Sequence, residues 1–274
     1  MNHALSIQAS FTMTALTRRI PLAAWRRRLR GCVVPAALVA AWQFASHGDA
    51  AHQYAFVPLQ QVGSALLELA RSGELATDLG ASLRRTTLGL GVGIAAGLAL
   101  GAAMARSTLV RKLCEPAFQA LRYVPLLGLI PLLSLWAGTG EFAKIFIVAL
   151  AAFYPMTTAS FDGLSRVDPR YVELAQSYRL TRVGLWRDVL IPGALPDLFT
   201  GVLQAVPFAW ITATSSELLF NAGAGVGNLM QNAQAGARAD VLLVCVLGVT
   251  ALAAGMSMLC ERIAQRAMRW RDHA

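Results

Sequence analysis

The polar residues of this sequence that could carry chemistry lie in two places. The first is residues 168–196, DPRYVELAQSYRLTRVGLWRDVLIPGALP, a charged stretch between apolar segments. The second is the run ITATSSE at 211–217, which ends in Glu217. The first offers charged and apolar side chains for recognition of a protein surface. The second offers hydrogen bonds and a charge inside an apolar segment.

The charged stretch has the local pattern of two short helices. Asp168 can accept a hydrogen bond from a free backbone N–H at a helix start, and Pro169 suits the first turn. Thr181 is a second candidate N-cap, and Pro192 leads into the next apolar segment. We predict a helix, a turn and a second helix, charged on one face and apolar on the other, as a docking surface for a protein partner.

The second group indicates a polar path through the membrane. Polar groups in apolar helices cost free energy, so they usually face the interior of a helix bundle or an aqueous path. A hydroxyl alone can instead bond to its own helix. A carboxylate needs a partner or water, so Glu217 is either a gate at the outer end of a path or an interfacial acid. The candidate path residues are Tyr154, Thr212, Ser215, Ser216 and Glu217.

The residues that other functional classes require do not occur in suitable patterns. The four cysteines form no CxxC pair, and no Cys/His cluster with metal-ligand spacing is found. No GxxxxGK[ST] segment occurs, so the chain has no P-loop for a nucleotide. The histidines lie outside the later apolar runs, which argues against an intramembrane enzyme. We predict a non-catalytic protein that binds no metal or cofactor.

Hydropathy predicts the elements that must position these residues. The chain of 274 residues is 56% hydrophobic and 14% charged, whereas a soluble domain carries about 25% charged residues. Its apolar runs approach the roughly 20 residues that cross a bilayer as a helix. We predict an all-α membrane protein with six transmembrane helices; the shortest run could also be a signal peptide. The runs are 32–45, 86–105, 118–138, 142–160, 198–220 and 241–259.

Basic residues fall in alternate connecting segments. Of the 24 lysines and arginines, 18 lie in 1–31, 106–117, 161–197 and 260–274. Since basic loops stay on the cytoplasmic side, we expect both termini and the charged stretch there. The net charge of +9 follows from these membrane flanks, so it requires no nucleic-acid partner.

Small residues and prolines modify individual helices. Gly89, Gly93, Gly97 and Gly101 form one stripe, which predicts close packing against another span. Pro125 and Pro131 each remove a backbone hydrogen bond from the third run, which membrane helices tolerate only beside protein or a wet cavity.

The predicted organisation has five parts. Residues 1–31 form a basic N-terminal segment, within which 1–17 are expected to be disordered. Residues 46–85 form an external loop with an amphipathic helix at 54–80, whose Val62, Leu66, Leu67 and Leu69 gather on one side. The other parts are the first transmembrane helix at 32–45, a five-helix core at 86–259 that includes the loop 161–197, and a tail at 260–274.

The charged stretch resembles the cytoplasmic loop signature of ABC-importer permeases, EAA–x3–G–x9–I–x–L–P. The matching residues are Glu173-Leu174-Ala175 and Val189-Leu190-Ile191-Pro192, at the same spacing. Arg179 stands where the signature has glycine. If that glycine forms a left-handed turn, arginine costs about 1–2 kcal/mol there.

The resemblance extends over about residues 55–230 and is greatest to the nitrate/sulfonate/taurine group of these permeases. It is carried by 72–101, 115–146, 162–177 and by Glu217 followed by GAGVG at 223–227. It implies a type I importer-like fold in the bacterial inner membrane, in contact with membrane lipid. It also implies that a second copy of this chain pairs with the first to form the pathway. It also implies cytoplasmic subunits that bind and hydrolyse ATP, and a periplasmic or lipid-anchored binding protein. The implied substrate is a small anion such as an organic sulfonate, taurine or nitrate.

Two questions stay open from the sequence. The resemblance implies that Asp168, Glu173, Ala175, Arg179 and Pro192 couple the permease to its ATPase, whereas a stand-alone secondary transporter or channel would work without ATP. Arg122 is either a contact for an anion or an interfacial anchor at the cytoplasmic end of the third run.

Overall fold

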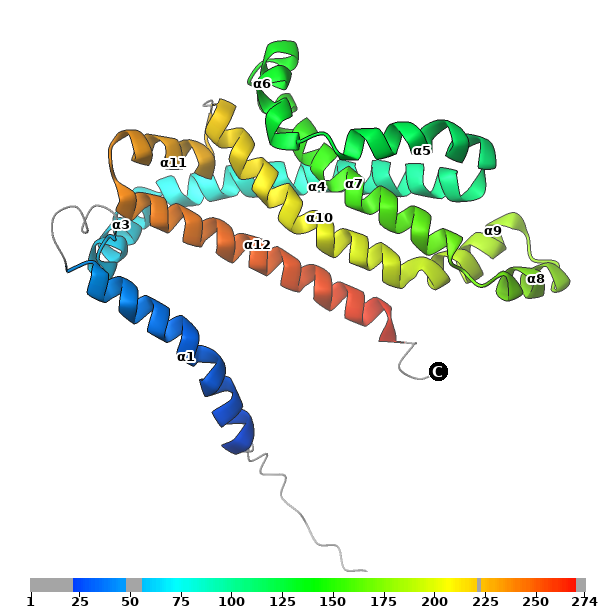
Figure 1. Cartoon of the computed structure of the whole chain (residues 1–274), viewed down its shortest axis with the longest axis horizontal. Coiled ribbons are helices and arrows are strands. Elements are labelled where there is room, and N and C mark those ends of the chain that lie inside the picture. Colours follow the sequence, from blue (N-terminus) through cyan, green and yellow to red (C-terminus); the bar gives the residue numbers. More distant parts are fainter. Residues whose placement is uncertain (1–21, 48–55, 221–222, 270–274) are drawn as a thin grey trace, which may run out of the picture. The chain divides into compact units, whose positions relative to one another are not determined.

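The computed structural model describes residues 22–47, 56–220 and 223–269, with side chains from Val33 onward in the first of these ranges. All regular elements in these ranges are helices (Figure 1). The chain divides into a small N-terminal unit up to Pro58 and a large unit from Leu59 onward. The expectation for residues 1–17 lies outside the described residues.

The small unit contains one long helix. Helix α1 runs from Leu22 to Ala45 and includes the shortest predicted apolar run. Near its end, the Trp42 indole Nε1 donates a hydrogen bond of 3.0 Å to the carbonyl of Val57. The Trp42 and Phe56 rings also meet edge to face, with centroids 5.1 Å apart. These contacts tie the end of α1 to the segment that follows it.

The five later predicted apolar runs lie on helices of the large unit. Four of its helical stretches are long and apolar enough to cross a membrane, and a fifth is obtained if the bent pair α5–α6 counts as one span. The four are α4, α7, the continuous stretch of α9, η1 and α10, and α12. The elements are α3 (Leu59–Ser72), α4 (Glu74–Arg106), α5 (Thr108–Arg122), α6 (Leu126–Ala137), α7 (Glu141–Ser165), α8 (Pro169–Ser177), α9 (Arg182–Leu185), the π-helix η1 (Trp186–Leu190), α10 (Ile191–Phe220), α11 (Val226–Ala235) and α12 (Ala239–Ala267).

The predicted glycine stripe is confirmed as the contact between α4 and α7. A Cβ atom added to Gly97 would lie 2.8 Å from the carbonyl oxygen of Phe153, and one added to Gly101 would lie 2.6 Å from that of Thr157. The backbones are therefore close enough for Ser160 Oγ to donate a 3.1 Å hydrogen bond to the Leu98 carbonyl. Small side chains are what permit this approach, which maximises dispersion contact in an apolar medium.

The third predicted apolar run does not form a single straight span. Helices α5 and α6 meet at an angle of 99°, with the break at Tyr123–Pro125. Pro125 has no backbone N–H and disfavours a helical conformation at Val124, which accounts for the break. Pro131 lies inside α6 without ending it.

The amphipathic helix expected over 54–80 is also wrong as one element. Gly73 has a φ of 77°, a left-handed conformation that ends α3, and α4 begins at Glu74. Val62 and Leu69 of α3 are buried as expected, whereas Leu66 and Leu67 are exposed. Helix α4 begins twelve residues before the predicted span at 86–105. The polar residues at 74–85, which the sequence assigns to the external loop, therefore belong to this helix.

Candidate functional site

Helices α8 and α9 begin at the two predicted caps. Asp168 Oδ1 accepts a 2.9 Å hydrogen bond from the N–H of Arg170, and Thr181 Oγ1 accepts one of 3.2 Å from the N–H of Gly184. Each cap satisfies one of the backbone donors that a helix start leaves free. The charged stretch therefore folds as a helix, a turn and a second helix.

The surface of α8 is both charged and apolar. Glu173 is exposed, and so are the large apolar side chains of Tyr171, Leu174 and Tyr178. Ala175 is buried. An exposed set of apolar side chains beside a free carboxylate is typical of a protein-binding surface.

Arg179 occupies a left-handed turn at the end of α8. Its φ is 54°, and the carbonyl of Ala175 accepts a 3.0 Å hydrogen bond from the N–H of Leu180. The N–H of Arg179 itself donates to the Gln176 carbonyl at 2.9 Å. This pair of bonds is the Schellman arrangement, which normally has glycine at the left-handed position. The left-handed turn considered from the sequence is therefore present, with arginine in it.

We expect Arg179→Gly to stabilise this turn by about 1 kcal/mol, because glycine adopts the left-handed conformation without a steric penalty. The measurement is thermal unfolding of the purified protein in detergent. Ala237→Gly is the matched control, since Ala237 also has a positive φ, of 53°, but lies at the end of α11. An increase in stability at Ala237 with a decrease at Arg179 would mean that the Arg179 side chain makes a contact that outweighs the strain.

The second helix of the stretch continues into α10 without a break. Helices α9, η1 and α10 form one stretch of 39 residues, from Arg182 to Phe220. The N–H of Ile191 donates to the carbonyl of Trp186, five residues back, whereas in an α-helix the acceptor is four residues back. The backbone is therefore a π-helix here, which is wider than an α-helix. This widening lies directly before Pro192, whose ring would clash with a carbonyl four residues back in a regular α-helix. Pro192 therefore lies within a continuous helical stretch that leads into the apolar segment.

A cavity of about 530 Å³ brings together two of the predicted path residues, Tyr154 and Thr212. It lies between the α5–α6 bend, α7 and α10. Ser215, Ser216 and Glu217 do not line it. Ser216 is buried and donates to the carbonyl of Ala213 in its own helix, and Ser215 is half-buried. The remaining lining residues are Arg122, Val124, Pro125, Leu126, Leu127, Ala151, Pro155, Thr158, Gln204, Phe208 and Ile211.

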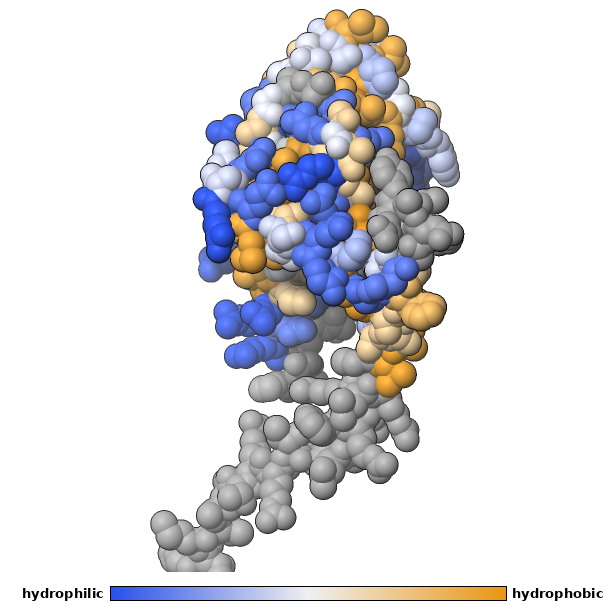
Figure 2. Space-filling view, turned by 90° about the vertical axis from the view of Figure 1, so that its left-hand side faces the viewer, coloured by the Kyte–Doolittle hydropathy of each residue, from blue (hydrophilic) through white to orange (hydrophobic). Residues whose placement is uncertain are grey.

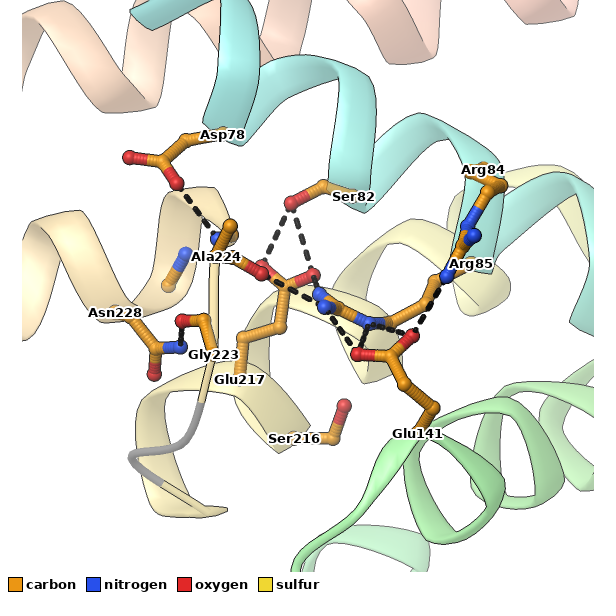
Figure 3. A network of polar contacts seen from close by, with 12 residues as sticks. Asp78, Ser82, Arg84, Arg85, Glu141, Ser216, Glu217, Gly223, Ala224 and Asn228 are labelled. Atoms are coloured by element: carbon orange, nitrogen blue, oxygen red, sulfur yellow. Dashed lines mark hydrogen bonds and ion pairs between the residues drawn. The ribbon is translucent and has the colours of Figure 1, made fainter. Parts of the chain in front are cut away.

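Glu217 lies in a buried polar network instead (Figure 3). Its side chain has no exposed area. Arg85 Nη1 donates to Glu217 Oε1 at 2.5 Å, and Ser82 Oγ lies 2.8 and 2.7 Å from the two carboxylate oxygens. The N–H of Gly227 donates to Oε2 at 3.0 Å. These bonds satisfy the carboxylate, which would be costly to bury alone.

Arg85 extends the network to α7 and to the loop between α10 and α11. Its Nη2 donates to Glu141 Oε1 at 2.6 Å and to the carbonyl of Ala224 at 2.7 Å. Asp78 accepts a 2.8 Å hydrogen bond from the N–H of Gly225. We call the set Asp78, Ser82, Arg85, Glu141 and Glu217 the buried latch; Glu141 is its one exposed member. The set connects the loop 223–227 to α4, α7 and α10.

Sequence reasoning missed Arg85 and Ser82, since both fell inside the predicted external loop 46–85. The signal that could have found them is Glu217, because a carboxylate in an apolar run needs a cation. Arg85 is the basic residue next to the start of the second run. Lys144, near the start of α7, is also buried. Within the described residues, no group of three or more His, Cys, Asp or Glu side chains could hold a metal ion.

Comparisons with known proteins show which sequences and folds this chain is similar to. Residues 91–269 match the family described as "Binding-protein-dependent transport system inner membrane component". The chain is 33% identical over 250 residues to the putative aliphatic sulfonates transport permease protein SsuC of Escherichia coli (strain K12), covering 91% of this chain and 95% of that protein. It is 31% identical over 218 residues to the taurine transport system permease protein TauC of the same organism, covering 78% and 79%. In fold it is similar to a crystal structure of an amino acid ABC transporter with histidines, with a TM-score of 0.56 at 18% identity, covering 74% of this chain and 97% of that one.

Proposed function

Because this chain belongs to the family of binding-protein-dependent transport system inner membrane components, we propose that it forms the translocation path of an ATP-driven importer for small organic sulfonates. The observation that carries the substrate class is the similarity to the aliphatic sulfonates permease over 91% of this chain and 95% of that protein. The similarity to the taurine permease supports the same class, since taurine is itself an aminoalkyl sulfonate. The chain itself performs no chemistry, and the ATP is bound and hydrolysed by separate subunits.

In this proposal, the α8–α9 surface is where the ATPase docks. Asp168 and Thr181 cap the two helix starts, Ala175 is buried, and Glu173 is exposed, as are the large apolar side chains of α8. The segment 161–197 carries five arginines, which favours a cytoplasmic position for this end of the large unit, together with both termini. A second copy of the chain completes the path in the bilayer.

The opposite end of the large unit then faces the binding protein. Figure 2 looks onto the end that carries α3 and α11, where hydrophilic side chains cover much of the surface. Arg238 donates to Glu68 at 2.9 Å and to Asp240 at 2.9 Å. The hydrogen bonds from Arg238 hold the pKa of Glu68 below its usual value, so this surface keeps its charges at neutral pH. Such charges favour specific orientation of a partner more than tight binding.

The function is tested by uptake of labelled ethanesulfonate in cells that produce this chain with its ATPase and binding protein. We expect uptake that requires all three proteins and is lost when the P-loop lysine of the ATPase is replaced. A stand-alone secondary transporter would take up the sulfonate without the ATPase. That result would overturn the importer assignment.

The docking surface is tested by capture of the ATPase on purified permease. We expect Glu173→Lys to weaken capture by about tenfold or more, because it reverses a charge at the centre of the proposed contact. Glu261→Lys is the matched control, since Glu261 is also exposed but lies on another helix, near the end of α12. Equal capture by the two variants would remove Glu173 from the docking surface.

A further inference from the structure

Arg122 occupies an unexpected depth in the large unit. Helix α5 begins at Thr108, directly after the turn at Ser107, and Arg122 is its last residue. Figure 1 shows α5 running back alongside α4, which is one of the membrane-crossing helices. Fifteen residues of helix rise about 22 Å, whereas the hydrocarbon core is about 30 Å thick. The helix therefore carries Arg122 well into the hydrocarbon core, whereas a span beginning near residue 118 would place it at the interface. This depth argues against a role as an interfacial anchor.

The cavity beside Arg122 lies at the same depth. Its walls from α7 are Ala151–Thr158, in the middle of a helix that runs from Glu141 to Ser165. Its walls from α10 are Gln204–Thr212, well inside the helix that ends at Phe220. Two helices therefore place the cavity near the centre of the membrane, independently of α5.

No acidic side chain among the described residues compensates the charge of Arg122. Its Nη1 donates to Gln119 Oε1 at 3.3 Å, and its guanidinium carbon lies 5.9 Å from the centroid of the Tyr123 ring. In the part of the chain that the structure describes, no carboxylate forms an ion pair with Arg122, and none lines the cavity. A cation at this depth requires an anion or water.

The other lining residues define what kind of anion fits. Tyr154, Gln204 and Thr212 line the same cavity as Arg122 and carry hydrogen-bond donors. The Thr158 hydroxyl donates to the Tyr154 carbonyl at 3.1 Å in its own helix. The remaining lining residues are apolar, among them Phe208 and Ile211. A guanidinium matches a tetrahedral oxyanion through two parallel N–H bonds. The volume lies within the usual range for small-molecule sites.

We propose that this cavity is a substrate site within the permease, in which Arg122 binds the sulfonate group and the apolar wall receives the alkyl chain. The proposal deepens the proposed function and rests on it for the identity of the substrate. Arg122 is then a residue that selects anions inside the path, after the binding protein has released its ligand.

The test measures occupancy directly rather than transport. In a variant whose native cysteines are replaced by alanine, Gln204→Cys places an exposed thiol in the cavity wall. The rate of its reaction with a neutral maleimide is followed in nanodiscs of zwitterionic lipid, with increasing hexanesulfonate. We expect protection of the thiol, and we expect Arg122→Gln to raise the protecting concentration about tenfold or more, through loss of a charge-assisted hydrogen bond. Arg122→Lys keeps part of the protection.

Matched controls separate the outcomes. Arg111→Gln makes the same change on α5, but its guanidinium pairs with Glu115 at 3.0 Å, outside the cavity, so protection stays unchanged. Hexanol and hexyltrimethylammonium carry the same chain without an anionic head, and neither protects. Equal protection by hexanol, or by hexanesulfonate in Arg122→Gln, would overturn the anion site.

A lipid headgroup is the other source of an oxyanion. If nanodiscs with phosphatidylglycerol protect the thiol introduced by Gln204→Cys in an Arg122-dependent manner and hexanesulfonate does not compete, the cavity is a lipid site and the proposal fails. If cells import a different solute in an ATP-dependent manner while hexanesulfonate still protects through Arg122, the anion site stands and the assigned substrate of the importer is wrong.

Discussion

Replacing Arg85 with glutamine is expected to lower the free energy of unfolding by about 3–5 kcal/mol. Arg85 is 2% exposed and bonds to two carboxylates, at 2.5 Å to Glu217 and 2.6 Å to Glu141. Its removal takes away the guanidinium that bonds directly to the fully buried Glu217 carboxylate and leaves the buried Lys144 as the cation that interacts with it. It also removes the donor to the Ala224 carbonyl, so the loop 223–227 should become sensitive to proteolysis.

Arg84 is the matched control for this experiment, since it is the adjacent arginine and also bonds to Glu141. Its side chain is 67% exposed and its distance to Glu141 is 3.3 Å. Exposed ion pairs contribute about 0–1 kcal/mol, so Arg84→Gln should have little effect on thermal unfolding. Equal losses for the two variants would mean that the buried latch is not what stabilises this end of the chain.

A double variant measures the pairing itself. Glu217→Gln alone is expected to cost less than Arg85→Gln, because Glu141 still compensates the charge of Arg85. In Arg85→Gln/Glu217→Gln, the loss should be smaller than the sum of the two single losses, since the carboxylate that Arg85 pairs with is removed together with it. Additive losses would contradict a direct energetic coupling between the two side chains.

The second large effect is expected at Gly93, where a single methyl group should weaken the α4–α7 contact. A Cβ atom at this position would collide with the carbonyl oxygen of Ala149 and lie 2.7 Å from the Ala152 Cβ. Backbone atoms cannot move aside as a flexible side chain can, so Gly93→Ala should destabilise the chain by about 2–3 kcal/mol.

Gly91 lies on the same helix with no atom within 4 Å of an added Cβ. Gly91→Ala should therefore be neutral or stabilise α4 by up to about 1 kcal/mol, because alanine is the better helix former. The two variants make the same chemical change, but Gly93→Ala is expected to lower the thermal midpoint and Gly91→Ala to leave it unchanged or raise it. A rise in both variants would show that helix propensity, rather than contact with α7, governs the glycines of α4.

The features that the sequence predicted correctly depend on neighbours along the chain. The caps at Asp168 and Thr181 and the glycine stripe each follow from short-range spacing along the chain and the backbone geometry it favours. Hydropathy likewise located the apolar helices, because the requirement to satisfy backbone groups in lipid acts on each segment separately.

The features that the sequence did not predict depend on distant parts of the chain. Arg85 and Glu217 are separated by 132 positions, and only the packing of α4 on α10 brings them together. The proline at 125 indicated a break, but not the angle of 99° that turns Arg122 toward a cavity with α7 and α10. Start points of helices were predicted from apolar residues, so Ser82 and Arg85 were assigned to a loop.

The unbroken helix from Arg182 to Phe220 has a thermodynamic consequence. Its 39 residues correspond to a rod of about 58 Å, with the proposed ATPase surface beside one end and Glu217 near the other. A tilt of about 5° at one end displaces the other by about 5 Å, which exceeds the length of any hydrogen bond in the buried latch. Two binding events that bias the same rod must influence each other equally. A partner that binds at the α11 end and favours one tilt therefore changes the affinity of the chain for the ATPase by some factor. The ATPase changes the affinity of the chain for that partner by the same factor.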